Sequence, residues 1–244
     1  MVVSQARGGG GDLALLVGVA AFKDVAEPVL VRIEARSRSV DFHDGAQIFA
    51  QGDAADSVYA IIGGTGRVRI GAVGRDSKGL MVELLGTGDI FGEIGVMDGN
   101  LRTADAFADG NVRLLRIGAP VFIETLTTHA ALGRNLCGML AIRLRRTFAL
   151  LQDATFESLE VRLARQVLYL ARRGGRRSEH GLRLAGRFRQ GDLADLLGAT
   201  TRTIITILNN WRAAGVVAYD ASRAQLTLID EAALEALIDT GAAG

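Results

Sequence analysis

Hydrophobic and polar positions change their period along the chain, and each change marks a new kind of element. From residue 13 to about residue 36 the apolar positions recur at helical spacing, and Pro28 favours two short helices there. From residue 39 to residue 117 short apolar or alternating runs predict strands, the clearest at 59–62, 68–70, 80–85 and 112–117. Glycine-rich turns separate these runs. Strands at this spacing are typical of a compact β-roll or barrel.

A helical period returns between residues 129 and 153, where Arg143, Arg145 and Arg146 leave few other residues to bury. Six positions follow alternating steps of four and three residues, which is the spacing of a heptad seam: Gly133, Cys137, Leu140, Leu144, Thr147 and Leu151. This pattern favours a parallel dimer in which Thr147 lies against the partner chain. Because about three heptads is short for a coiled coil, a single amphipathic helix packed on its own roll stays as the alternative.

The C-terminal third mixes short helices with short strands. Helices are expected at 157–172, ended by the polar run 173–180, and over 191–208. Short strands are expected at 182–185, 216–219 and 225–229. Two helical periods meet at Gly198, where a left-handed backbone is expected, and the hydroxyl of Thr200 is placed to cap the second helix. This is the pattern of a helix-turn-helix followed by a two-stranded wing.

Composition excludes several classes of site. The chain has 244 residues, enough for one large domain or two ordinary ones, and a net charge of +1. One cysteine, Cys137, excludes a disulfide framework within the chain and any cysteine-only metal or iron–sulfur site. A reducing cytoplasm fits this best, so we expect a cytoplasmic protein. Apolar stretches shorter than the ~20 residues of a membrane helix, and no signal-peptide pattern, predict no membrane association. We expect residues 1–12 to form a mobile tail.

Positive charge is concentrated in the region of the expected helix-turn-helix. Residues 156–228 carry 12 basic and 6 acidic side chains, whereas residues 1–155 carry 16 basic and 17 acidic ones. The remaining tail, 229–244, carries 4 acidic side chains and no basic ones. The near-zero net charge therefore conceals one basic stretch, which suits an anionic partner.

The strongest motif of the N-terminal half lies at residues 91–104. A short turn opens on the carboxylate of Glu93 and closes on Arg102, followed by the hydroxyl of Thr103. Such a turn offers an acceptor for sugar hydroxyls beside a planar guanidinium that binds two phosphate oxygens at once. From the residues alone, a salt bridge between Glu93 and Arg102 that merely holds a loop explains the pattern equally well.

This segment resembles the phosphate-binding cassette of cyclic-nucleotide-binding domains. Together with the helix-turn-helix, the chain resembles bacterial transcription regulators of the cyclic AMP receptor protein and fumarate–nitrate regulator (Crp/Fnr) family, from residue 13 to about residue 237. The resemblance implies an α+β fold and no catalytic activity. The implied domains are a cyclic-nucleotide-binding β-roll at 13–128, a dimerisation helix at 129–155 and a winged helix-turn-helix at 156–244.

The resemblance also implies a role for each residue of the cassette. Glu93 matches the acid that holds the ribose 2′-hydroxyl, Arg102 the arginine on the cyclic phosphate, and Thr103 the hydroxyl that supports this phosphate. Gly92 matches the glycine whose backbone approaches the ribose, and Ile94 follows in the same cassette. The implied effector is a cyclic mononucleotide, and no metal is implied.

The resemblance leaves the purine base of the effector less certain than its sugar and phosphate contacts. Thr147 falls on the long-helix threonine that meets the purine at the dimer seam, but Phe148 stands where the receptor protein has a serine. Cyclic AMP is favoured, and cyclic GMP is the second choice. A roll that has lost its nucleotide and acts mainly as a dimerisation scaffold stays as the alternative.

In the C-terminal domain the resemblance places residues 200–206 at the start of the recognition helix, whose first turns contact base edges in the major groove. Arg189 stands where relatives often carry a capping threonine, so a side-chain cap is exchanged for a phosphate contact. The expected DNA-binding residues are Arg187, Arg189, Thr200, Thr201, Arg202, Thr203 and Thr206, with Arg212 as a further cation. Implied partners are double-stranded DNA, a second copy through residues 129–155, and bacterial RNA polymerase.

Two other function classes fit the sequence less well. The same roll gates kinases and channels as a regulatory module, but the helix-turn-helix and the basic C-terminal region argue against that class. A haem sensor needs an axial ligand, and the three histidines, His43, His129 and His180, are scattered along the chain. We therefore expect a ligand-gated DNA-binding regulator.

Overall fold

The computed structural model describes residues 5–6, 13–73, 79–184 and 187–241. The chain divides into two compact units, of which unit 1 falls within residues 1–72 and 82–144, and unit 2 within residues 73–81 and 145–244. The division lies inside one long helix, α5 (Ala130–Phe156), so that residues 130–144 belong to unit 1 and residues 145–156 to unit 2.

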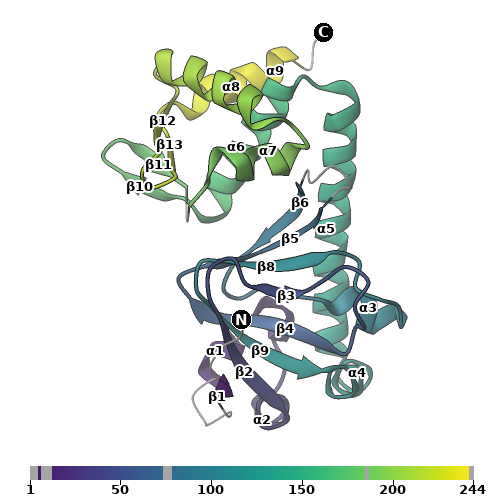
Figure 1. The fold of residues 1–244 in the computed structure, drawn as a ribbon. Helices are drawn as coiled ribbons and strands as arrows, with labels where there is room; N and C mark the ends of the chain where they lie inside the picture. The colour runs from purple at the N-terminus through teal and green to yellow at the C-terminus, as the bar shows by residue number, and fades with distance from the viewer. Residues whose placement is uncertain (1–4, 7–12, 74–78, 185–186, 242–244) are drawn as a thin grey trace. The chain divides into compact units, whose positions relative to one another are not determined.

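Unit 1 is a β-roll with short helices before, within and after it (Figure 1). Its helices are α1 (Leu13–Val17), the 3-10 turn η1 (Ala20–Phe22), α2 (Glu27–Ala35), α3 (Glu93–Asp98) and α4 (Ala119–Thr128). The strands are β1 (Gln5–Ala6), β2 (Ser37–Phe42), β3 (Gln47–Phe49), β4 (Ser57–Gly64), β5 (Arg67–Val73), β6 (Gly79–Leu85), β7 (Ile90–Phe91), β8 (Asp105–Asp109) and β9 (Val112–Gly118), of which only Val73 and residues 79–81 are counted with unit 2. They form two sheets, ordered β1-β2-β9-β4-β7 and β3-β8-β5-β6. The prediction of a β-roll is confirmed.

Strand β4 is buried on both of its faces, which explains its unbroken apolar run. Ala60 and Ile62 pack into the core that the roll shares with the flanking helices, where Phe22 and Phe122 are fully buried. The alternate residue Ile61 points into the roll interior, together with Tyr59, Leu85 and Phe91. Side chains of successive strand residues point to opposite faces, so a strand between two cores needs apolar residues throughout.

Two details of the N-terminal region differ from the sequence prediction. Gln5 and Ala6, within the expected mobile tail, pair as β1 with β2, while the rest of that tail lies outside the described residues. Pro28 lies in the first turn of α2 rather than between two helices. A proline is tolerated there because the amide hydrogens of the first turn have no partner within the helix.

Helix α5 is buried at its start and exposed further along. Leu132 and Leu136 are fully buried in the core of unit 1. Several apolar side chains that follow are more than half exposed: Ile142, Leu144, Phe148, Leu151 and Phe156. Leu144 and Leu151, two positions of the predicted heptad seam, are thus exposed in the single chain, and the dimer seam stays a prediction.

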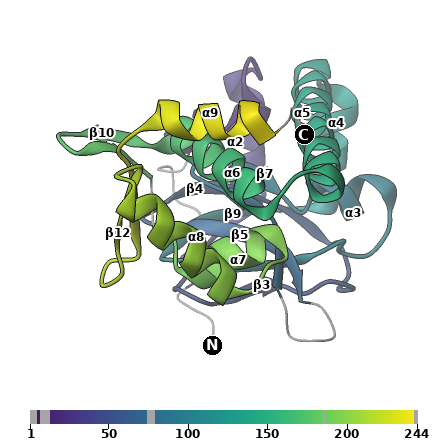
Figure 2. The same cartoon turned by 90° about the horizontal axis from the view of Figure 1, so that it is seen from above.

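Unit 2 combines helices with a small antiparallel sheet (Figures 1 and 2). Its helices are α6 (Leu159–Gly174), α7 (Gln190–Leu197), α8 (Thr201–Ala213) and α9 (Glu231–Gly241). Its strands are β10 (Arg176–Ser178), β11 (Gly181–Arg183), β12 (Val217–Asp220) and β13 (Gln225–Leu228), in the order β10-β11-β13-β12. The expected wing is β12 and β13. Strand β10 was not expected, because the run 173–180 is wholly polar apart from its glycines.

Helices α7 and α8 form the expected helix-turn-helix. Gly198 ends α7 in the left-handed conformation, with φ 61° and ψ 30°, and the hydroxyl of Thr200 accepts a hydrogen bond from the amide of Thr203. Helix α8 is fixed to α6 by the indole of Trp211, which donates to the Glu160 carboxylate at 2.8 Å. These local signals are therefore confirmed.

Candidate functional site

Arg102 is buried between α3 and β8, and its side chain is 2% exposed. Its Nη1 donates to the carbonyl oxygen of Gly92 at 2.7 Å, and its Nη2 donates to the hydroxyl of Ser57 at 3.3 Å. The guanidinium carbon lies 4.3 Å from the centre of the Phe49 ring. This distance is within the range of a cation–π contact. The arginine that the sequence motif predicts is therefore buried and held by both hydrogen bonds and an aromatic contact.

The charge of Arg102 is poorly compensated within the described residues. Its Nε atom is buried without a hydrogen-bond partner, and the nearest carboxylate oxygen, on the 62% exposed Asp56, lies 3.7 Å from Nη2. Burial lowers the pKa of Arg102, because removal from water disfavours the charged form. A buried guanidinium with a spare donor and only an exposed carboxylate nearby fits a bound phosphodiester.

Gly92 allows the backbone to approach this guanidinium. It precedes α3 with φ 77°, which is unfavourable for other residues. A Cβ atom at this position would lie 2.6 Å from Nη1 of Arg102 and 3.3 Å from Cε1 of Phe49. The backbone conformation therefore favours glycine, and a larger residue would displace the Arg102 guanidinium.

Glu93, the first residue of α3, is 1% exposed and is bound by an arginine of α5. Nη1 of Arg143 donates to Oε1 of Glu93 at 2.7 Å, and Nη2 donates to the carbonyl oxygen of Ile90 at 2.7 Å. Nε of Arg143 lies 3.1 Å from Oε2 of Glu83. Burial raises the pKa of Glu93, and the charge of Arg143 opposes this shift only in part.

These contacts decide between the two interpretations of the motif. Within the described residues Glu93 and Arg102 do not pair with one another, because Glu93 binds Arg143 and Arg102 binds Gly92 and Ser57. A Glu93–Arg102 salt bridge is therefore wrong as an explanation of the motif. The two side chains stand as separate groups within one cassette.

The other predicted effector-site residues lie in different surroundings. Ile94 is 43% exposed on α3, and Thr103 is exposed in the turn that follows Arg102. Thr147 is exposed on α5 and belongs to unit 2, whereas the cassette residues belong to unit 1. The structure thus brings Gly92 into contact with Arg102, with Glu93 and Ile94 beginning the adjoining helix.

Sequence reasoning missed Arg143, Ser57 and Phe49. The heptad pattern places Arg143 outside the seam, among the polar residues of the long helix, yet Arg143 lies one turn before Thr147, on the same helix face. The four-residue spacing between Arg143 and Thr147 is therefore a sequence signal that could have marked Arg143 as a site residue. Ser57 and Phe49 come from strands β4 and β3, and no local pattern connects them with Arg102.

Helix α8 presents a polar face opposite its buried face. Ile204, Ile207, Leu208 and Trp211 are buried, while the predicted DNA-binding residues of this segment are exposed: Thr200, Thr201, Arg202, Thr203 and Thr206. Within the described residues the guanidinium of Arg202 makes no hydrogen bond or ion pair. The Thr206 hydroxyl donates to the carbonyl oxygen of Arg202 at 3.1 Å.

The remaining predicted cations lie around the start of α7 and the end of α8. Arg187, Arg189 and Arg212 are all exposed. Arg189 precedes α7 without a side-chain cap, as expected, but its amide donates to the carboxylate of Asp192 at 2.8 Å. This reverse half of a capping box was missed in the sequence, although an acidic residue three positions after the cap is its signature.

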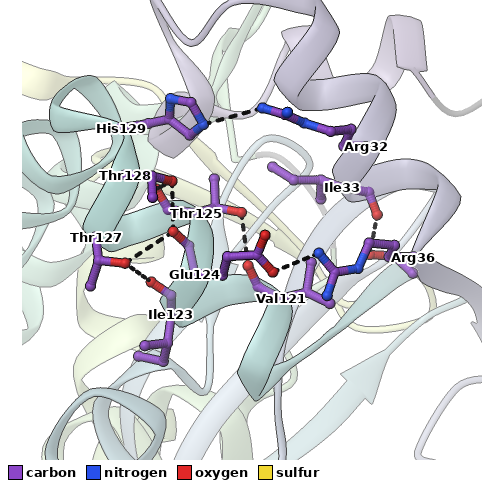
Figure 3. Close-up of polar contacts among 11 residues, drawn as sticks. Arg32, Ile33, Arg36, Val121, Ile123, Glu124, Thr125, Thr127, Thr128 and His129 are labelled. Atoms are coloured by element: carbon purple, nitrogen blue, oxygen red, sulfur yellow. Dashed lines mark hydrogen bonds and ion pairs between the residues drawn. The ribbon is translucent and has the colours of Figure 1, made fainter.

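A separate cavity of about 210 Å³ lies between α2 and α4, and Figure 3 draws the polar contacts among the residues around it. On its rim Arg36 donates to Glu124 at 2.6 Å, and Nη2 of Arg32 lies 3.5 Å from Nε2 of His129. Arg32, Arg36 and Glu124 are exposed, His129 is partly buried, and none belongs to the predicted sites. The cavity is therefore distinct from the Arg102 cassette.

The described residues contain neither a metal-binding cluster nor a membrane-spanning helix. Among the described residues, no group of three or more histidine, cysteine or acidic side chains is arranged to hold a metal ion. None of the described helices is long and apolar enough to cross a membrane.

Comparisons with known proteins identify both units. Residues 39–129 match the family described as the cyclic nucleotide-binding domain, and residues 161–237 match the Crp-like helix-turn-helix domain. The CRP-like cAMP-activated global transcriptional regulator of Mycobacterium tuberculosis is 30% identical over 190 residues, which cover 78% of this chain and 84% of that protein. The cyclic AMP receptor protein of Thermus thermophilus is 29% identical over 176 residues, 72% of this chain and 77% of that protein.

Solved structures agree on the fold. The c-di-GMP-responsive global regulator CLP of Xanthomonas campestris superimposes with a TM-score of 0.73 at 20% identity, over 84% of this chain and 100% of that one. The β-roll, the long helix α5 and the helix-turn-helix follow one another along the chain, with the two matched domains on either side of α5. The chain therefore belongs to the Crp/Fnr family of transcription regulators.

Proposed function

We propose that the protein is a homodimeric, effector-gated regulator that binds double-stranded DNA and responds to a cyclic mononucleotide, with cyclic AMP favoured over cyclic GMP. It acts in the cytoplasm, contacts bacterial RNA polymerase and has no catalytic role. The observation that carries the proposal is the buried guanidinium of Arg102, whose Nε has no hydrogen-bond partner and whose nearest carboxylate is the exposed Asp56, in a chain whose relative in Mycobacterium tuberculosis is named as cAMP-activated.

Three groups of the cassette suit the parts of a cyclic nucleotide. Arg102 supplies a cation and an unpartnered Nε donor for the phosphate. Glu93 supplies carboxylate oxygens for the ribose hydroxyls, while its Oε1 also accepts a hydrogen bond from Arg143. Thr103 is exposed next to Arg102 and offers a hydroxyl. The charge-assisted hydrogen bonds between Arg102 and the phosphate are expected to contribute most to the binding energy.

The exposed side of α8 suits the major groove. Arg202 matches the two acceptors of guanine, and threonine hydroxyls and methyl groups suit phosphates, base edges or thymine methyls. Arg187, Arg189 and Arg212 supply positive charge for the phosphate backbone. In a two-fold dimer the two α8 helices would read half-sites about 34 Å apart.

The first test is calorimetric titration of the purified protein with cyclic AMP and with cyclic GMP. We expect both to bind at micromolar or tighter affinity, cyclic AMP more tightly, and with one nucleotide per chain. If the roll acts only as a dimerisation scaffold, neither nucleotide will bind at millimolar concentration while DNA binding persists.

The role of Thr147 is tested by replacing it with valine, which keeps the shape and removes the hydroxyl. A ligand shifts an equilibrium only by its differential affinity for the two states. If the Thr147 hydroxyl meets the purine across the seam, Thr147→Val will lower the effect of cyclic AMP on DNA affinity more than it lowers nucleotide affinity. One neutral hydrogen bond is worth about 1 kcal/mol, so nucleotide affinity should fall about fivefold.

Two measurements on the same protein decide this. Calorimetry gives the nucleotide affinity, and fluorescence anisotropy gives the DNA affinity with and without cyclic AMP. Equal losses in both, or no loss in either, would show that Thr147 only packs in the seam.

A further inference from the structure

Glu93 shares its arginine with a second carboxylate that comes from another strand. The Arg143 guanidinium donates through Nη1 to Glu93 of α3 at 2.7 Å, and its Nε faces Glu83 of β6 at 3.1 Å. Its Nη2 donates to the carbonyl oxygen of Ile90 in β7 at 2.7 Å. One side chain of α5 is thus held by three elements that surround the effector-site carboxylate.

The three charged side chains are largely removed from water. The exposed fraction is 1% for Glu93, 18% for Arg143 and 16% for Glu83. Ion pairs at this depth differ from surface pairs, because removing one partner leaves an uncompensated charge in a poorly solvated place. The Glu83–Arg143 pair is therefore expected to have a larger effect than an exposed pair at the same distance.

The shape of a guanidinium makes the Glu83 contact directional. Arginine presents its donors in one rigid plane, so an acceptor at Nε restricts where the two Nη groups point. With Nε on Glu83, the Nη groups of Arg143 face Glu93 and the Ile90 carbonyl. Without that acceptor, the long side chain regains rotamer freedom.

We propose that Glu83 is a positioning residue of the effector site, which holds the Arg143 guanidinium against Glu93 and so keeps the Glu93 oxygens aligned to accept ribose hydroxyls. This inference rests on the proposed function. Glu83 itself does not contact the nucleotide. It acts on the site through Arg143, and it connects β6 to α5 at that point.

The first experiment measures cyclic AMP affinity by calorimetry for Glu83→Ala and Glu83→Gln. We expect Glu83→Ala to weaken binding about fivefold, because Arg143 loses its directional acceptor. Glu83→Gln should lose less, because its amide oxygen still accepts a hydrogen bond from Nε. The matched control is Glu124→Ala, which removes the exposed Arg36–Glu124 pair of the same unit and should leave the affinity unchanged (Figure 3).

A second measurement separates positioning from a simple charge effect. The described charged groups that face Glu93 are Arg143, which lowers the pKa of Glu93, and Glu83, which raises it more weakly. If Glu83 positions Arg143, Glu83→Ala will raise the pKa of Glu93, because the larger attraction is weakened. If Glu83 is merely a nearby negative charge, the same variant will lower it.

This pKa is measured in the nucleotide-free protein by carbon-13 NMR of the glutamate carboxyls, with the Glu93 signal assigned from Glu93→Gln. A raised pKa in Glu83→Ala supports the inference, whereas an unchanged or lowered pKa overturns it. Circular dichroism of each variant shows whether it is folded, and Glu83→Gln provides the comparison if Glu83→Ala is not. A wild-type protein that binds no cyclic nucleotide overturns the proposed function, while the pKa result still decides the role of Glu83.

Discussion

Replacing Arg102 with alanine is expected to weaken cyclic nucleotide binding more than tenfold. The substitution removes a buried guanidinium whose Nε lacks a partner and whose nearest carboxylate is 3.7 Å away. A charge-assisted contact to a phosphate in such a place is worth about 2 kcal/mol or more, and each 1.4 kcal/mol corresponds to a factor of ten. Calorimetric titration with cyclic AMP measures the loss directly.

Two further variants make this result specific. Arg102→Lys keeps a positive charge but replaces the planar donors by one ammonium, so an intermediate loss is expected. Arg113→Ala removes a half-exposed arginine of the same roll, which pairs with Asp41, and should not change the affinity. Unaltered binding by a folded Arg102→Ala protein would show that the phosphate does not bind at this residue.

Placing two glutamates on the exposed face of α5 is expected to abolish dimerisation. Leu144 and Leu151 are 55% and 58% exposed and lie one heptad apart, so they share one side of the helix. Fully burying a leucine side chain contributes about 1.5–3 kcal/mol, and a two-fold interface contains each position twice. Leu144→Glu combined with Leu151→Glu should therefore raise the dimer dissociation constant more than a hundredfold.

Sedimentation equilibrium at micromolar concentration measures this constant. Val17→Glu is the control, because Val17 is an equally exposed apolar residue, at 61%, on α1 instead of α5. The double variant should be monomeric while the control and the wild type are dimeric. A wild-type protein that is monomeric with ligand and with DNA present would rule out the seam, as would a double variant that still dimerises.

Local signals in the sequence predicted most of the fold because they depend on neighbouring residues. Gly198 and Thr200 mark the turn of the helix-turn-helix through backbone conformation and hydroxyl capping, and both behave as expected. The apolar run of β4 likewise indicates a strand between two cores. By contrast, β10 lies in a polar run whose side chains give no strand pattern, and it forms a strand through its backbone pairing with β11.

The candidate site was predictable only where one short segment contains it. Gly92, Glu93 and Arg102 lie within a single cassette, so their spacing pointed to the chemistry. The pairing of Glu93 with Arg143 joins residues far apart in the chain, and no periodicity encodes it. Contacts of Arg102 with Ser57 and Phe49 depend in the same way on how the strands of the roll are brought together.

The central claim is that a cyclic nucleotide controls DNA binding, and DNA affinity with and without the nucleotide tests it most directly. The probe is a labelled duplex that the protein selects from a random-sequence library in the presence of cyclic AMP. Binding is followed by fluorescence anisotropy at one fixed salt concentration, because phosphate contacts make the DNA affinity salt-dependent. We predict that cyclic AMP raises the affinity of the wild type for this duplex at least tenfold and has no such effect on Arg102→Ala. The same DNA affinity with no nucleotide, with cyclic AMP and with cyclic GMP would contradict the claim.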